Sequence, residues 1–254
     1  MPLTNPNKPF LLLQAREEVA AAEGEYQAIR QFSGLSPADL TRINLLAEPM
    51  PAFDLAEYSG LIIGGSPFNT SDVESEKAPV QQRVEAELLY LLDRVIAADF
   101  PWLGLCYGMG LLGQYLGASV DRQFGEGAGT VLVTQTPAGQ ADPLLAGIPQ
   151  QFLALTGHKE AISQMPAQAT LLASSETGPV QMLRLGANAY ATQFHPELDE
   201  AGLKERLAIY LDKGYCQPDE YDQVVASIHN APIGHSHQIL HNFAQRYAVP
   251  VTAK

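Results

Sequence analysis

Short, largely apolar runs alternate with amphipathic stretches in the first half of the chain. Phe10–Gln14 and Gly60–Ile63 have the length and apolar character of strands buried on both faces, and Ile43–Leu46 is a third candidate. Glu17–Phe32 and Glu76–Ala98 carry apolar side chains at every third or fourth position, which predicts two amphipathic helices. Strands that alternate with helices predict a doubly wound, mainly parallel α/β sheet with right-handed crossovers.

The pattern changes after residue 116. Short strand signals, separated by turns that contain Pro or Gly, predict added strands of which some pair antiparallel. These signals are Thr130–Thr134, Phe152–Leu155, Thr170–Ser174, Val180–Leu185 and Tyr190–Phe194, and Arg184–Tyr190 has the pattern of a hairpin. From Asp199 onward the apolar spacing is helical again. We expect one domain over residues 1–254, with a core at about 8–212 and a C-terminal helical extension at about 213–254.

One stretch, Phe100–Leu116, joins a strand to a helix through a turn of small residues. Cys106 is the apex of this turn, between Gly104 and Gly108. A sharp strand-to-helix turn with one nucleophilic side chain at its apex is the arrangement of a nucleophile elbow. The glycines leave room for the strained apex, and the start of a helix favours a thiolate. The alternative is a buried structural cysteine beside a glycine-rich packing turn, because such short motifs recur by chance.

A histidine and a carboxylate follow another expected strand. Tyr190–Phe194 runs into a loop that carries His195 and Glu197. A cysteine nucleophile needs a histidine that takes and returns a proton, and a carboxylate that orients the imidazole. Ligands of parallel sheets bind at the carboxyl ends of the strands. The pattern therefore places Gly64–Gly65, Cys106 and His195 at the same edge of the sheet.

Four segments resemble motifs of the class I (triad) glutamine amidotransferase family, in the order in which the family has them. They are the elbow around Cys106; the string His195-Pro196-Glu197; Tyr58–Pro67, which resembles a strand ending in a Gly-Gly-x-Pro loop; and Thr156–Glu160 with Leu171–Ser175, which resemble the Ser-His-Gly-Asp and Ala-Ser-Ser segments. The resemblance covers about residues 8–212 and is greatest to the glutaminase half of GMP synthetase. It implies a flavodoxin-like, doubly wound sheet with added antiparallel strands and C-terminal helices.

The resemblance also implies a role for each residue of the site. Cys106 would attack the γ-carboxamide of glutamine and form a thioester, His195 would act as base and then as acid, and Glu197 would orient the imidazole. The backbone N–H groups of Gly65 and Tyr107 would form the oxyanion hole. The residues implied at the substrate-binding site are Gly64, Gly108, Gly110 and His158.

Position 110 departs from the family pattern. Many members have Gln four residues after the nucleophile, where its side chain helps to bind glutamine, whereas this chain has Gly110. Gln114 or Gln193 could supply the lost hydrogen bond. Alternatively, the natural substrate could be another γ-glutamyl compound.

Other candidate residues have ordinary structural interpretations. His158 could equally be a capping or loop residue, and Lys159 with Glu160 is most simply a solvated pair. The C-terminal histidines, His229, His235, His237 and His241, have no neighbouring cysteine or carboxylate that completes a recognisable metal site, since Cys216 is distant in sequence. A solvated helix face is favoured, and we expect neither a metal nor another cofactor.

Composition and charge argue against several classes of function. With 15 Lys and Arg against 28 Asp and Glu, the formal net charge of −13 disfavours non-specific binding to nucleic acid or to an anionic membrane surface. No apolar run approaches the ~20 residues of a membrane span. The polar N-terminus lacks the apolar core of a signal peptide, and two cysteines fit a reducing compartment. We therefore expect a cytoplasmic protein.

Three functions are compatible with these patterns. The first is a glutaminase that either supplies ammonia to a separate synthetase partner or releases it, because the chain has no ATP-binding loop of the Gly-x4-Gly-Lys-Ser/Thr type. The second is a γ-glutamyl hydrolase or peptidase that acts without a partner and tolerates Gly110. The third is a non-catalytic or redox-regulatory protein on the same fold. The complete set of Cys106, His195 and Glu197 argues against the third.

Overall fold

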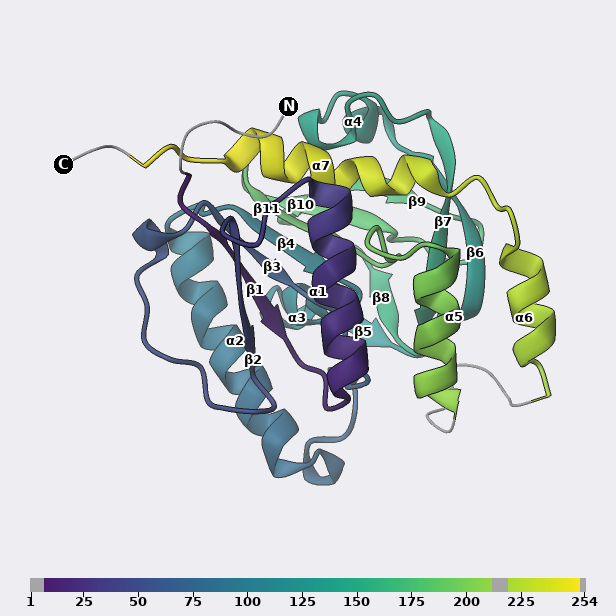
Figure 1. Ribbon diagram of the computed structural model, residues 1–254, viewed down its shortest axis with the longest axis horizontal. Coiled ribbons are helices and arrows are strands. Elements are labelled where there is room, and N and C mark those ends of the chain that lie inside the picture. The colour runs from purple at the N-terminus through teal and green to yellow at the C-terminus, as the bar shows by residue number, and fades with distance from the viewer. Residues whose placement is uncertain (1–6, 212–218, 252–254) are drawn as a thin grey trace.

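A nine-stranded mixed sheet forms the centre of the computed structural model, which describes residues 7–211 and 219–251 (Figure 1). The strand order is β2-β1-β3-β4-β11-β10-β9-β6-β7. The parallel half contains β2 (Leu40–Asn44), β1 (Phe10–Gln14), β3 (Gly60–Ile63), β4 (Trp102–Leu105) and β11 (Ala189–Thr192). The antiparallel half continues with β10 (Met182–Leu185), β9 (Ala169–Ser174), β6 (Glu126–Gln135) and β7 (Gln151–His158).

Helices cover both faces of the parallel half. Phe10 and Leu12 of β1 belong to an apolar cluster with α1 (Val19–Ser33) and α7 (Gly234–Tyr247). Leu11 and Leu13, which point to the opposite face, belong to a second cluster with α2 (Pro79–Ala97) and α3 (Tyr107–Tyr115). Alternate side chains of a strand face opposite sides of a sheet, so a fully apolar strand needs a layer on each side. The predicted doubly wound fold, with added antiparallel strands and C-terminal helices, is confirmed.

The remaining helices pack near the antiparallel half. α5 (Glu200–Ile209) and α6 (Tyr221–Ile228) share a small apolar cluster with Leu155 in the middle of β7, and Figure 1 shows α5 beside α1. A short helix α4 (Pro137–Gln140) and one-turn 3-10 helices η1 (Leu55–Glu57), η2 (Glu74–Glu76) and η3 (Pro143–Leu145) complete the set. The expected boundary near residue 213 and Cys216 lie outside the described residues. Within those residues, no helix is both long and apolar enough to cross a membrane.

Several boundaries differ from the sequence expectation, and two strands were missed. The helix expected from Glu76 begins at Pro79, because a proline without an N–H group fits the first helical position. The second strand lies at Leu40–Asn44 rather than Ile43–Leu46. The missed strands, β5 (Ser119–Asp121) and β8 (Ala161–Gln164), form a separate two-stranded sheet. Both are short, and their register carries a bulge, so neither gives a clear alternating pattern.

Three neighbouring strands position the site. β3, β4 and β11 are adjacent and parallel, so their carboxyl ends lie at one edge. The loops that leave these ends carry Gly64–Gly65, Cys106 and His195. The predicted hairpin is also present, with Arg184 paired to Tyr190 across β10 and β11. It returns the chain to β4, which brings the segment after β11 next to the elbow.

Candidate active site

The turn between β4 and α3 holds Cys106 in a strained conformation. Its φ of 52° and ψ of −88° are unusual for a residue other than glycine. A Cβ atom at Gly104 would lie 2.8 Å from the backbone of Gly108, so the turn closes only with glycine there. The Cys106 N–H donates to the Thr192 carbonyl oxygen at 2.8 Å, which ties the elbow to β11. This geometry is that of a nucleophile elbow.

His195 and Glu197 form a buried hydrogen-bonded pair. Nδ1 of His195 donates to Oε1 of Glu197 at 2.8 Å, and Glu197 is completely buried. Burial raises the pKa of Glu197, but His195 and Arg206 outweigh it and hold that pKa below its ordinary value. Because the ionised carboxylate accepts the Nδ1 proton, Nε2 of His195 is left to accept a proton from elsewhere. The His195 N–H donates to the Leu155 carbonyl oxygen at 2.8 Å and so fixes the loop.

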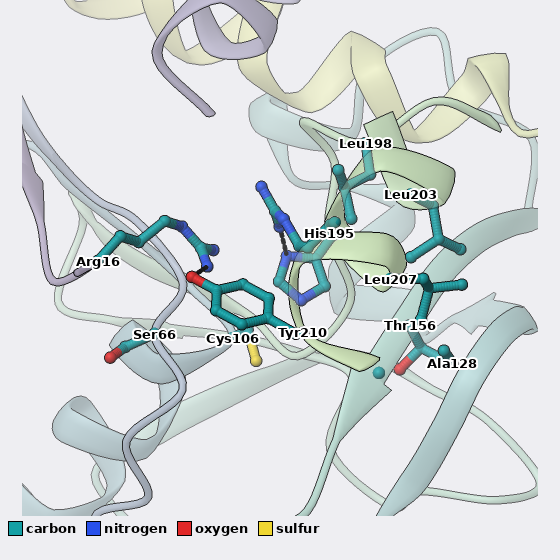
Figure 2. A pocket seen from close by; sticks show the side chains of 12 residues that line it. Arg16, Ser66, Cys106, Ala128, Thr156, His195, Leu198, Leu203, Leu207 and Tyr210 are labelled. Carbon is teal, nitrogen blue, oxygen red and sulfur yellow. Dashed lines mark hydrogen bonds between the residues drawn. The ribbon is translucent and has the colours of Figure 1, made fainter. Parts of the chain in front are cut away.

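Arg206 of α5 supports this pair. Its Nη1 lies 3.0 Å from Oε1 of Glu197 and 3.4 Å from Nδ1 of His195, the second contact being drawn in Figure 2. Both nitrogens carry protons, so each donates to the same carboxylate oxygen. Arg206 thereby favours the ionised form of Glu197.

The thiol of Cys106 is only partly exposed, and its surroundings do not favour a thiolate. Desolvation, with the negative charges of Glu197 and Glu160, raises the pKa of Cys106 to about 12, while Arg16 and Arg206 act in the opposite direction. The expectation of a thiolate at the start of α3 is therefore wrong for this state of the site. A thiolate at Cys106 therefore requires a base that removes the thiol proton.

The two backbone donors expected at the oxyanion hole differ in their availability. Tyr107 is the first residue of α3, so its N–H has no acceptor within the helix. The Gly65 N–H instead donates to Oε1 of Glu25 at 3.1 Å. Glu25 is fully buried on α1 and also accepts from Nε of Arg16 at 2.9 Å. Of the two expected donors, the one at Gly65 is held by a buried carboxylate.

Steric contacts explain why positions 64 and 65 are both glycine. A Cβ atom at Gly64 would collide with the carboxylate of Glu25, and one at Gly65 would lie 3.0 Å from Cε1 of His195. The loop backbone therefore passes between the buried carboxylate and the imidazole, and only residues without side chains fit there.

Two pockets meet at Cys106. The first, shown in Figure 2, is also lined by His195, with Leu198, Leu203 and Leu207 on one side and Arg16 and Tyr210 on the other. Its cavity volume is about 30 Å³, which has room for about two water-sized molecules.

The second pocket lies against α3. Tyr107, Gly110, Glu160 and Gln193 line it together with Cys106. Gln114 is exposed on α3 and does not line either pocket. Of the two glutamines considered as substitutes for the missing side chain at position 110, only Gln193 is in place to contact a ligand. Gly108, which the resemblance implied at the substrate, packs against the Ile63 side chain instead.

Glu160 is a buried residue, which corrects the expectation of a solvated pair with Lys159. It is 7% exposed, and its Oε1 accepts from the backbone N–H of Thr70 at 2.8 Å and from Oγ1 of Thr70 at 3.0 Å. Its Oε2 accepts from the N–H of Ser71 at 2.7 Å. A Cβ atom at Gly110 would lie 2.8 Å from Oε1, so this carboxylate takes the space where a larger side chain at 110 would begin.

The ring of His158 has a structural role. Its Nε2 lies 2.7 Å from Oε2 of Glu126, and its Nδ1 lies 2.9 Å from the Glu160 carbonyl oxygen. Burial raises the pKa of Glu126, but hydrogen bonds from His158, Thr177 and Gln181 outweigh it and lower that pKa to about 2. Neither ring nitrogen of His158 is left for a substrate, which favours the structural interpretation of this residue.

The C-terminal histidines make separate contacts. His237 of α7 stacks on Phe32 with a centroid distance of 3.7 Å, and its Nδ1 donates to the Pro196 carbonyl oxygen at 2.8 Å. His229 lies 2.9 Å from a Glu200 carboxylate oxygen. Within residues 7–211 and 219–251, no group of three or more His, Cys, Asp or Glu side chains could hold a metal ion. Through its hydrogen bond to Pro196, His237 instead stabilises the loop between His195 and Glu197.

Sequence reasoning missed the charged residues that hold the site together, Arg16, Glu25 and Arg206. Glu25 did leave a signal, because it lies on the same face of α1 as the buried Ala22 and Ile29. A carboxylate on the core stripe of an amphipathic helix is buried only with partners. Arg16 and Arg206 left no comparable pattern.

Comparison with known proteins agrees with the fold and the motifs. The "Glutamine amidotransferase class-I" family model matches residues 37–207. GMP synthase [glutamine-hydrolyzing] of Thermus thermophilus is 28% identical over 171 residues, which is 67% of this chain and 29% of that protein. The chain thus spans less than a third of the length of this curated relative.

Solved structures share the fold. A glutamine amidotransferase of Thermotoga maritima superposes with a TM-score of 0.71 at 22% identity, covering 94% of this chain and all of that one. A glutamine amido transferase of Methylobacillus flagellatus gives a TM-score of 0.73 at 17% identity, with 98% of each chain covered. Since the family model spans well over half of the sequence, the chain belongs to the class I glutamine amidotransferase family.

Proposed function

We propose that this protein hydrolyses the γ-amide of glutamine through a thioester on Cys106 and passes the ammonia to a separate synthetase. The observation that carries the proposal is the pairing of an elbow cysteine with a histidine whose Nδ1 is held by a buried carboxylate at 2.8 Å. Cys106 and His195 line one pocket at the edge of the sheet.

The first half-reaction acylates the enzyme. His195 takes the thiol proton on Nε2 while Sγ of Cys106 attacks the amide carbon of glutamine. The Tyr107 N–H lies at the start of α3, where a developing oxyanion is stabilised. The imidazolium then gives its proton to the amide nitrogen, the carbon–nitrogen bond breaks, and ammonia leaves behind a γ-glutamyl thioester.

The second half-reaction releases glutamate. His195 takes a proton from water, the oxygen attacks the thioester carbon, and the carbon–sulfur bond breaks. The thiolate recovers the proton from His195. The small cavity beside Cys106 and His195 supports this scheme, because ammonia and water both fit in a space of about 30 Å³.

A raised thiol pKa makes the histidine indispensable in this scheme. With a pKa of about 12 for Cys106, almost no thiolate exists at neutral pH in the free site. Proton transfer to His195 must therefore accompany the attack, and the ionised Glu197 stabilises the imidazolium that results.

We infer the synthetase partner from a relative of which this chain matches only one part. The relative of Thermus thermophilus carries the words "GMP synthase [glutamine-hydrolyzing]", and this chain matches 29% of its length. The amidotransferase reaction also needs a synthetase unit that uses the ammonia, and we propose that a separate partner supplies it.

A second candidate function is hydrolysis of another γ-glutamyl compound without a partner. The observation that favours it is the glycine at 110 with the carboxylate of Glu160 in the adjoining space. This arrangement changes the surface that a substrate meets, while Cys106, His195 and Glu197 keep their geometry.

Steady-state release of glutamate separates the two candidates. The purified chain is given glutamine or a γ-glutamyl dipeptide, beside a Cys106→Ala control that removes the nucleophile. The proposal predicts glutamate from glutamine that is absent in the control. Release from the dipeptide but not from glutamine would favour the second candidate, and equal rates with the Cys106→Ala variant would refute both.

A further inference from the structure

We propose that the small cavity beside Cys106 and His195 accepts a methyl group on the amide nitrogen of the substrate, so that this enzyme also hydrolyses γ-glutamyl amides of small, uncharged amines. The inference rests on the proposed function and adds a class of substrate to it. In the balanced reaction, γ-glutamyl methylamide and water give glutamate and methylamine, and His195 delivers the proton that the amine carries away.

The position of His195 decides which of the two pockets receives the leaving group. Both pockets border Cys106, and His195 lines the first pocket but not the second. The amide nitrogen takes a proton from Nε2 of His195 when the carbon–nitrogen bond breaks, so this nitrogen must lie within hydrogen-bond reach of that atom. A substituent on the nitrogen therefore enters the cavity of about 30 Å³ that His195 lines.

One side of this cavity is made of hydrocarbon. Leu203 and Leu207 of α5, with Leu198 just before the helix, are all buried and lie to one side of His195 in Figure 2. Ala128 of β6 also lines the cavity. These side chains cannot form hydrogen bonds, so contact with a hydrocarbon group is more favourable for them than contact with water. The wall therefore suits an alkyl substituent on the leaving nitrogen.

The two arginines that line the cavity are already paired with carboxylates. Nη2 of Arg16 lies 2.8 Å from Oε1 of Glu25, and Nη1 of Arg206 lies 3.0 Å from Oε1 of Glu197. Their positive charges are therefore neutralised within the protein. Burial of a further carboxylate without a countercharge is costly. An amine that carries its own carboxylate, such as the amino acid part of a γ-glutamyl dipeptide, is therefore disfavoured as a leaving group.

The volume of the cavity limits the substituent to about one carbon atom. A space of about 30 Å³ has room for about two water-sized groups. One of these places must be open in the second half-reaction, when water attacks the thioester. The first half-reaction needs no such water, so the amide nitrogen and one methyl group can take the two places. A propyl group exceeds this space.

The test measures glutamate release from glutamine, γ-glutamyl methylamide, γ-glutamyl propylamide and γ-glutamylglycine, with Cys106→Ala as the background. Wild type should hydrolyse the methylamide with a kcat/KM within about tenfold of that for glutamine, because burial of the methyl group gains about fourfold against the lower reactivity of a substituted amide. The propylamide, which is too long, should fall below about one hundredth of the glutamine value. γ-Glutamylglycine, which adds a charge, should fall equally far.

The variant Leu207→Ala separates the effect of size from that of charge. Loss of this side chain leaves space for about three carbon atoms, so hydrolysis of the propylamide should rise at least about tenfold relative to glutamine. γ-Glutamylglycine is close to the propylamide in size but anionic, and it should not gain. Ile209→Ala shortens an apolar side chain on the same helix that does not line the cavity, and all substrate ratios should stay as in wild type.

The contrary outcomes distinguish this inference from the proposed function. Wild type that hydrolyses glutamine but not the methylamide overturns the inference and leaves glutamine hydrolysis standing, whereas wild type that hydrolyses neither overturns both. Equal gains of the propylamide in Leu207→Ala and Ile209→Ala would show that loosening of α5, rather than the cavity, admits the substituent, and would also overturn it. If Leu207→Ala does not fold, as judged by circular dichroism, the order of the four substrates in wild type decides.

Discussion

The N–H of Gly65 donates to Oε1 of Glu25 at 3.1 Å, so a donor expected at the oxyanion hole is bonded to a carboxylate on α1. The same oxygen lies 2.8 Å from Nη2 of Arg16, and Nη2 of Arg206 approaches it to 4.0 Å. For Gly65 to stabilise an oxyanion, its peptide must turn away from Glu25. The buried ion pair therefore supports both the loop and, through Arg206, the pair of His195 and Glu197.

Removal of Glu25 should destabilise the fold strongly. Glu25→Ala leaves the charge of Arg16 buried without its countercharge, which costs about 3–5 kcal/mol of unfolding free energy. Denaturant unfolding measures this loss. In the double variant Arg16→Ala/Glu25→Ala the orphan charge is absent, so the loss should be smaller than the sum of the single losses. If each single variant loses less than about 1 kcal/mol, and the two losses simply add in the double variant, the Arg16–Glu25 pair contributes little to stability.

Substitution of Glu197 by glutamine should remove activity while preserving the fold. The amide cannot fix the Nδ1–H tautomer of His195 or stabilise its positive charge, and we expect kcat to fall by about 100- to 10,000-fold. Glutamate release, with circular dichroism to show that the fold is intact, checks the result. Arg206→Lys keeps a positive charge beside Glu197 and should cost far less. Comparable losses in the two variants would mean that Glu197 acts only through the local packing.

The raised pKa of Cys106 predicts the pH dependence of its alkylation. Because only the thiolate reacts, the rate with iodoacetamide should rise about tenfold per pH unit and continue to rise towards a pKa of about 12. Stopped-flow or mass-spectrometric alkylation between pH 6 and pH 10 measures the profile, within the range where the fold is intact. A plateau that begins near neutral pH would contradict a protonated resting thiol.

Glu126 should contribute stability that is lost in acid. Its folded pKa of about 2 is below the ordinary value of 4.5, so its contribution is present above about pH 4.5. The contribution falls as the pH drops from 4.5 towards 2, because the folded state then resists protonation that the unfolded state accepts. The size is up to about 3 kcal/mol. Urea unfolding at pH 7 and at pH 3 should show a smaller acid loss in Glu126→Gln than in wild type, and an unchanged loss would refute the assignment.

The sequence was sufficient to predict the edge of the sheet at which the site lies. Cys106 and His195 each follow a short apolar strand, and the parallel pairing of β4 with β11 brings them together. The glycines around Cys106 also leave a local signal, because the elbow closes only without side chains. These features depend on neighbours in sequence and on one general rule of parallel sheets.

Contacts between distant segments could not be predicted in this way. Glu160 reaches Thr70 across 90 positions, and nothing near residue 160 in the sequence indicates that the carboxylate will be buried. The contact of Glu25 with Gly65 spans 40 positions. Burial, and after it the charges of Glu197 and Glu160, raises the pKa of Cys106, and both carboxylates lie far away in the chain, whereas the sequence shows only the helix start. Residue type and spacing therefore predict which residues meet at the proposed active site but not the electrostatics of that site.

The most direct test of the central claim is mass spectrometry of the acyl-enzyme intermediate. Wild type and Cys106→Ala are mixed with glutamine, quenched in acid within milliseconds to seconds, and digested for peptide mapping. The proposed mechanism predicts one γ-glutamyl group on the peptide that contains Cys106, absent from the variant and lost on treatment with hydroxylamine. Glutamate release without any adduct at Cys106, or an equal adduct elsewhere in both proteins, would contradict it.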